Sequence, residues 1–203
     1  MKKILIAGVL GGLVNFAWGA VFHMMLPLGK AGMSRLPNED DALEAIQENV
    51  RGPGLYVFPW MEDPADASAE RKEAVEKEWT EKYRRGPSGL MVLLPRDQDP
   101  LRTSQLLTEF ASNLVCALLA AALLGQAVKA GTGYPGCVLL CALLGLFASV
   151  SIDVSYWNWF GFPTDFATAA IVEQTAGWGL AGLAIGAILR RSPARASAPA
   201  PMP

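Results

Sequence analysis

Long apolar runs constrain this chain more than any other feature of its sequence. There are four of them, at residues 4–26, 105–128, 134–156 and 166–189. Each is longer than the roughly 20 residues that an α-helix needs to cross the hydrocarbon core of a bilayer. We therefore predict a mainly α-helical integral membrane protein, in which these segments form a bundle of four transmembrane helices.

Composition excludes several classes of function. The chain has 203 residues, of which 52% are apolar and 18% charged, with a net charge of −2, so a strongly basic nucleic-acid-binding protein is excluded and we expect no nucleic acid partner. Its three cysteines all lie in apolar runs, which excludes a disulfide-built secreted domain. It has one histidine, too few for a multi-histidine zinc enzyme. Without a phosphate-binding loop, dinucleotide fingerprint, nucleophile elbow or haem-attachment motif, we expect no cofactor, no bound metal and no enzymatic activity.

The positions of lysine and arginine predict the orientation in the membrane. If four helices alternate in direction, the basic residues close to the helix ends fall on one side, namely Lys2, Lys3, Lys129, Arg190, Arg191 and Arg195. The turn between the third and fourth helices has none, and its aromatic residues (156–162) are typical of an interfacial belt. By the positive-inside rule we expect both termini to be cytoplasmic. We expect the membrane to be a bacterial inner membrane, whose lipid surrounds the bundle.

The same reasoning divides the chain into parts. Residues 1–26 are expected to form the first transmembrane helix, although Lys2, Lys3 and the small residues Ala17, Gly19 and Ala20 also resemble a cleavable signal peptide. The apolar run continues past that site, which favours retention. Residues 27–104 form a periplasmic loop domain, residues 105–190 contain the other three helices, and residues 191–203 are a disordered tail rich in proline, alanine and serine.

Residues 27–104 are expected to be ordered, as a small αβαβ domain. Asn38 precedes an acidic turn, which predicts a capped helix from about residue 39 to residue 50. A second helix is expected at 65–85, where glutamates precede basic residues by four positions. Short apolar runs at 55–58 and 90–94 predict two strands, for which a parallel pairing is one possibility.

Polar side chains recur inside the predicted transmembrane helices. The candidate intramembrane polar cluster consists of His23, Glu109, Asn113, Asp153 and Glu173. The predicted topology places its four ionisable members in the outer third of the membrane, one on each helix. Because burial disfavours a charged carboxylate, we expect at least one of them, Glu173 first, to be protonated at neutral pH.

Three interpretations of this cluster stay open. It can be structural and fix helix packing, it can be a proton- or ion-linked site, or it can bind a metal or small ligand. No His-x-x-Glu or Glu-x-x-His spacing supports a metal. The cysteines, Trp18 and Trp178 are interpreted as packing residues.

Two short motifs carry a resemblance to a known kind of protein. The first runs from Trp18-Gly19 to Pro27-Leu28-Gly29-Lys30, and the second is Trp159-Phe160-Gly161-Phe162-Pro163, followed by Gly177 and Gly186-Ala187-Ile188-Leu189. The layout resembles uncharacterised bacterial four-helix inner-membrane proteins of the domain-of-unknown-function kind. That resemblance implies the four-helix topology and no activity, and the long loop at 27–104 departs from it.

Three functional hypotheses follow. The first is a non-enzymatic accessory subunit or scaffold, whose periplasmic domain binds a protein partner or which forms a homo-oligomer. The second is a small proton- or ion-linked transporter or channel that uses the carboxylate cluster. The third is an enzyme that acts on lipid at the outer interface, for which Ser151, Ser155 and His23 would have to converge.

Overall fold

Four helices in the computed structural model are long and apolar enough to cross a bilayer. They are α1 (Lys2–Met25), α4 (Thr103–Lys129), α5 (Tyr134–Phe160) and α6 (Thr164–Arg190). The structure describes residues 1–190, of which 72% are helical. The mainly helical class and the four long apolar helices are therefore confirmed, whereas the predicted disorder of 191–203 lies outside the described residues.

The ends of these helices differ by a few residues from those predicted, for local reasons. α4 begins earlier because the Arg102 backbone N–H donates to the Gln105 side-chain oxygen at 2.9 Å, which caps its first turn. α5 continues through the aromatic run to Phe160 and ends at Gly161, whose φ of 70° favours glycine. After α1 comes a single 3₁₀ turn, η1 (Pro27–Lys30).

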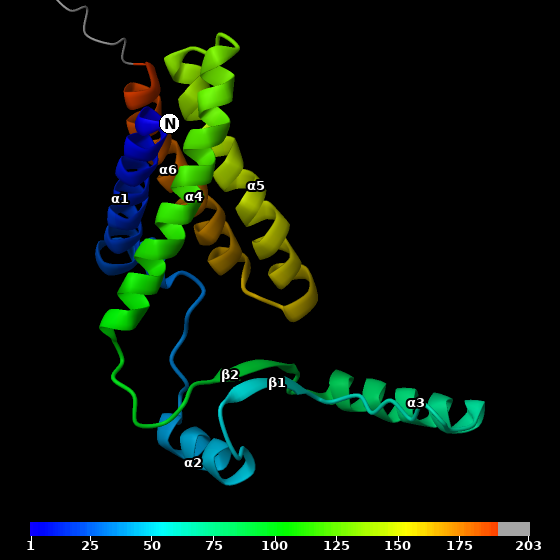
Figure 1. Ribbon diagram of the computed structural model, residues 1–203. Coiled ribbons are helices and arrows are strands. Elements are labelled where there is room, and N and C mark those ends of the chain that lie inside the picture. Colours follow the sequence, from blue (N-terminus) through cyan, green and yellow to red (C-terminus); the bar gives the residue numbers. More distant parts are fainter. Residues whose placement is uncertain (191–203) are drawn as a thin grey trace, which may run out of the picture. The chain divides into compact units, whose positions relative to one another are not determined.

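Small residues bring α1 against both α4 and α6 (Figure 1). A Cβ atom at Gly8 would lie 2.9 Å from Cα of Leu118, and one at Gly12 would lie 3.0 Å from Cα of Leu114, both on α4. Gly11 faces Ile185 of α6 in the same way. The absence of side chains at these positions thus allows the helix backbones to approach closely, as in other small-xxx-small interfaces.

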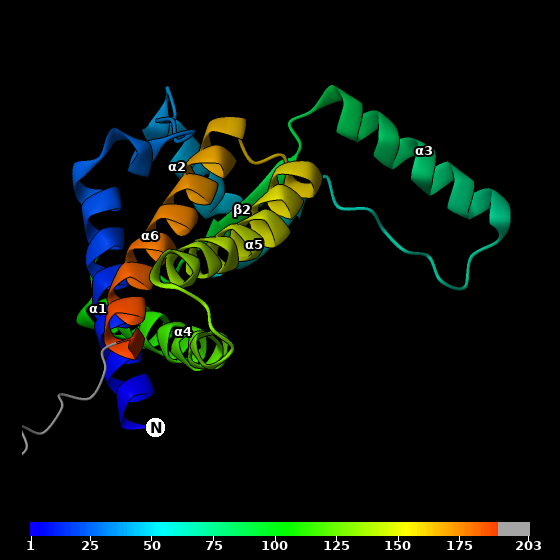
Figure 2. The same ribbon diagram turned by 90° about the horizontal axis from the view of Figure 1, so that it is seen from above.

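α5 packs on α6 and diverges from α4, as Figures 1 and 2 both show. Gly182 and Gly186 of α6 face Cys141 and Cys137 of α5, and both cysteines are fully buried. These two cysteines are packing residues, as expected, whereas Cys116 is exposed. The buried core of the bundle is correspondingly made of small side chains, among them Ala7, Ala117, Ala121 and Ala181.

The chain divides into two compact units. One comprises Met1–Met33, Leu101–Trp157 and the described residues from Phe162 onward, and the other comprises Ser34–Pro100 with Asn158–Gly161. The second unit contains α2 (Glu39–Asn49), β1 (Gly54–Phe58), α3 (Ala69–Arg85) and β2 (Gly89–Leu93), in the predicted order. Asn38 occupies the N-cap position of α2, but its side chain makes no capping hydrogen bond.

The two strands pair antiparallel, with Gly54 opposite Leu93 and Phe58 opposite Gly89, so the possible parallel pairing is wrong. A parallel pair needs a crossover that returns the chain to the opposite end of the sheet. Here the chain leaves and re-enters at the same end, and α3 extends from that end (Figure 1). α3 also begins four residues later than predicted, at Ala69 rather than 65, because Ser68 caps it by accepting a hydrogen bond from the Arg71 N–H.

Candidate functional site

His23 and Glu173 form a contact between α1 and α6. Their Nε2 and Oε1 atoms are 3.0 Å apart, and the two side chains are 59% and 14% exposed. Gly19, one turn before His23, faces the same carboxylate, since a Cβ atom there would lie 3.9 Å from Glu173 Oε1. The spacing of Gly19 and His23 places both on one face of α1, which leaves space for the glutamate of the neighbouring helix.

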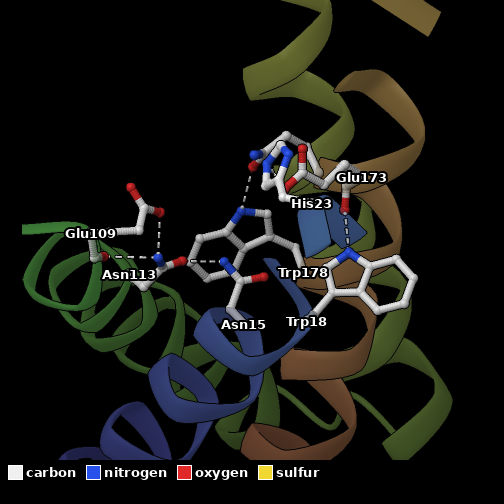
Figure 3. A network of polar contacts seen from close by, with 8 residues as sticks. Asn15, Trp18, His23, Glu109, Asn113, Glu173 and Trp178 are labelled. Carbon is white, nitrogen blue, oxygen red and sulfur yellow. Dashed lines mark hydrogen bonds and ion pairs between the residues drawn. The ribbon is translucent and has the colours of Figure 1, made fainter. Parts of the chain in front are cut away.

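Two tryptophans donate hydrogen bonds to α6 in the same region. Trp18 Nε1 donates to the backbone oxygen of Glu173 at 3.0 Å, and Trp178 Nε1 donates to Gln174 Oε1 at 3.2 Å (Figure 3). Gly177 provides the space, because a Cβ atom there would lie 2.6 Å from Cδ1 of Trp18. Both indoles therefore pack between helices and also satisfy their only hydrogen-bond donor.

A second set of contacts connects α1 to α4. Asn15 Nδ2 donates to Asn113 Oδ1, and Asn113 Nδ2 donates to the backbone oxygen and to Oε1 of Glu109, at 2.8 and 2.7 Å. Asn113 is only 8% exposed, and both ends of its amide are hydrogen-bonded. This amide thus satisfies its own polar groups and joins α1 to the Glu109 carboxylate (Figure 3).

Asp153 is placed apart from these contacts. Ser149 Oγ, one turn earlier on α5, donates to Asp153 Oδ2. Within residues 1–190, no hydrogen bond or ion pair joins Asp153 to His23 or Glu173. Of the five predicted site residues, the structure thus joins His23 to Glu173 and Asn113 to Glu109, and leaves Asp153 with its own helix.

The described residues contain no group of three or more histidine, cysteine, aspartate or glutamate side chains that could hold a metal ion. The two serines of the hypothesis of an enzyme acting on lipid donate hydrogen bonds to the backbone of their own helix. Ser151 Oγ donates to the Ala148 backbone oxygen, and Ser155 Oγ donates to that of Ser151. Neither contact involves His23, whose neighbour is Glu173.

A groove of about 470 Å³, which sequence reasoning missed, lies where α5 diverges from α4. Asn15, Glu109, Ser112, Asn113 and Gln174 line its polar part. A second, apolar hollow of about 430 Å³ shares Leu123, Leu144 and Phe147 with it. The pattern of apolar residues contains no signal for this groove, because it fixes which segments are helices and not the angle between two of them.

Comparison of the chain with protein-family models, with curated proteins and with solved structures finds no match.

Proposed function

We propose that the chain is an integral membrane protein whose helices α1, α4, α5 and α6 span the bilayer. Large apolar side chains on these helices point outward, for example Leu119, Leu139 and Phe147, which are 62%, 59% and 74% exposed. Apolar surface of this extent is unfavourable in water and favourable in lipid. The test is fractionation of cells followed by alkaline carbonate washing. We expect the chain to stay in the membrane pellet, and its release into the supernatant would contradict this placement.

The orientation proposed is both termini in the cytoplasm and residues 27–104 in the periplasm of a bacterial inner membrane. The start of α1, the α4–α5 turn and the end of α6 lie at one end of the bundle, and Arg190 Nη1 donates to the Thr132 backbone oxygen at 2.5 Å across that end. Lys2, Lys3 and Lys129 belong to the same end, which supports a cytoplasmic position. Alkaline phosphatase fused after residue 100 should be active, and fused after residue 131 inactive; the reverse pattern would invert the orientation.

Within that membrane the chain acts as a non-enzymatic accessory subunit or scaffold. The observation that carries this proposal is that polar groups in the predicted spans form hydrogen bonds between helices. Asn15 donates to Asn113 between α1 and α4, and Trp18 donates to the backbone oxygen of Glu173 between α1 and α6. Such contacts fix the arrangement of the helices.

Residues 27–104 are the proposed partner-binding part. Leu55 and Val92 pair across the two strands on one face of the sheet, and they are 64% and 62% exposed. A two-stranded sheet with an open apolar face is marginal by itself, which favours its completion by a partner protein or a second copy.

Native mass spectrometry of the protein, extracted from its own membrane in mild detergent, tests this role. We expect a stoichiometric protein partner or a homo-oligomer, and we expect Val92→Asp to remove it. Ala74→Asp, at an exposed position of α3, makes the same change in charge away from the sheet and is the matched control. A lone monomer in both the original protein and the control would contradict the proposal.

The alternative function, proton- or ion-linked transport, is favoured by one contact. The His23–Glu173 pair places an ionisable couple inside a predicted span, with Glu173 largely shielded. If this is the function, Glu173→Gln abolishes a proton flux in proteoliposomes, whereas Asp165→Asn at the exposed start of α6 leaves it unchanged. The predicted protonation of Glu173 is read from its carboxyl band by infrared spectroscopy, which Glu173→Gln removes. No flux in the unmodified protein would end this alternative.

A further inference from the structure

The groove between α4 and α5 has two chemically different parts. Its polar part contains Glu109 and Asn113, and further along α4 it continues into a hollow bordered by Leu123 and Leu124. From Glu109 to Leu124 the helix rises by roughly 22 Å, at 1.5 Å per residue. A groove of this length with one polar end suits an amphiphile that lies parallel to α4.

The apolar part opens outward rather than into the core. Leu119, Leu123 and Phe147 border the groove and are 62%, 58% and 74% exposed. The floor is different, since Trp178 is 9% exposed and is held against Gly145, where a Cβ atom would lie 2.8 Å from its Cδ1. A molecule can therefore enter from the surrounding lipid while a fixed indole limits its depth.

The charge of the polar part restricts the headgroup. Glu109 is the only ionisable side chain other than Cys116 that lines the groove, and no lysine, arginine or histidine does so among the described residues. Asn113 occupies Oε1 of Glu109, and the other carboxylate oxygen has no hydrogen-bond donor within residues 1–190 (Figure 3). An unpaired carboxylate oxygen beside hydroxyl and amide groups attracts an ammonium group with hydrogens to donate and disfavours a headgroup with net negative charge.

From these observations we infer that the α4–α5 groove binds a zwitterionic phospholipid whose headgroup ends in a primary ammonium group. The ammonium donates to Glu109, the Ser112 hydroxyl and the Gln174 amide are within the same polar part, and an acyl chain covers Leu123, Leu144 and Phe147. This inference rests on the proposed membrane placement of the four helices.

The test is native mass spectrometry of the delipidated full chain, titrated separately with phosphatidylethanolamine, phosphatidylcholine and phosphatidylglycerol. We expect one phosphatidylethanolamine to be retained per chain in preference to the other two, since phosphatidylcholine has no N–H to donate and phosphatidylglycerol is anionic. Glu109→Gln keeps an acceptor for Asn113 but removes the charge. It should lower the ratio of phosphatidylethanolamine to phosphatidylcholine by about two- to fivefold, the change expected for a partly exposed ion pair.

A second pair of variants tests the apolar part. Leu144→Trp fills the groove and should abolish retention of every lipid, whereas Leu139→Trp, on the same helix but outside the groove, should leave retention unchanged. Equal retention of the three lipids, or a preference that Glu109→Gln leaves unchanged, would overturn the inference. So would a lipid-free dimer that Leu144→Trp dissociates and Val92→Asp does not, which would assign the groove to a second copy. Carbonate release of the chain would overturn the membrane placement as well, so the two failures are distinguishable.

Discussion

Both ends of the Asn113 amide are hydrogen-bonded, because its oxygen accepts from Asn15 and its nitrogen donates twice to Glu109. We predict that Asn15→Ala and Asn113→Ala are coupled, since each removes the same hydrogen bond between α1 and α4. Interhelical hydrogen bonds in membranes contribute about 0.6 kcal/mol on average and at most about 1.7 kcal/mol, and the coupling energy should fall in that range. Unfolding of the four proteins of the cycle in mixed micelles of increasing denaturing detergent measures it.

Ser112→Ala is the control for this cycle, because the Ser112 hydroxyl donates to the backbone of its own helix. Its free energy of unfolding should change little and should add to that of Asn15→Ala. A coupling energy near zero between Asn15 and Asn113 would show that the two amides do not hold the helices together.

At the scale of single elements, α1 and α4 pack so closely that only glycine fits at Gly8. Gly8→Ala introduces a Cβ atom 2.9 Å from Cα of Leu118, where the backbone cannot move aside easily. We predict a loss of about 1–3 kcal/mol in the free energy of unfolding, the usual range for overpacking. Ala20→Leu adds more volume on an exposed position of α1 and should have little effect in the same detergent titration. Equal effects of the two changes would contradict the close approach of α1 to α4.

The helix α3 should lose stability in acid. The backbone N–H of Glu70 and the Ser68 hydroxyl lower the pKa of Glu70 below its ordinary 4.5, and Lys82, 2.8 Å from Glu78, lowers the pKa of Glu78. A carboxyl group with a lowered pKa in the folded state stabilises that state above about pH 4.5, and this contribution is lost as the pH falls through the lowered values.

Amide hydrogen exchange of the intact chain measures this effect. We expect protection of residues 69–85 to be lower at about pH 3 than at about pH 6, after correction for intrinsic rates. Glu78→Gln should reduce the difference, because glutamine does not titrate, whereas Glu76→Gln, for which no ion pair is present among the described residues, is the control. Equal protection at both pH values would contradict the prediction.

The helices and strands were largely predictable from the sequence, whereas the way they pack and pair with one another was less predictable. Runs such as 134–156 exceed the length of any ordinary strand, so only a helix accommodates them. The contact between His23 and Glu173 agrees with the common level that the rise per residue predicts for them along two helices of opposite direction. The direction of β2 relative to β1 could not be predicted, because the pattern of apolar residues in a strand does not show which end of the neighbouring strand lies beside it. The groove depends on the angle between α4 and α5, and the pattern of apolar residues does not predict that angle.

At the scale of the whole molecule, α1 is part of the bundle rather than an appendage. Gly8 and Gly12 face α4, Gly11 faces α6, and the two partner helices contact each other much less. We predict that the mature protein keeps α1, although the sequence also resembles a cleavable signal peptide. The intact mass of protein purified from membranes should therefore include residues 1–26, and a mass lower by about that segment would show cleavage.

The position of α1 between two later helices has a consequence for timing during synthesis. Its partner α4 leaves the ribosome roughly a hundred residues after α1, and α6 follows later still. At about 5–20 residues per second, α1 waits on the order of 5–20 s before α4 is complete. In the proposed membrane placement its glycine face meets lipid during that interval instead of a neighbouring helix, and other helices with small-residue faces can bind it. α1 can therefore complete its packing only after α4 and α6 have been made.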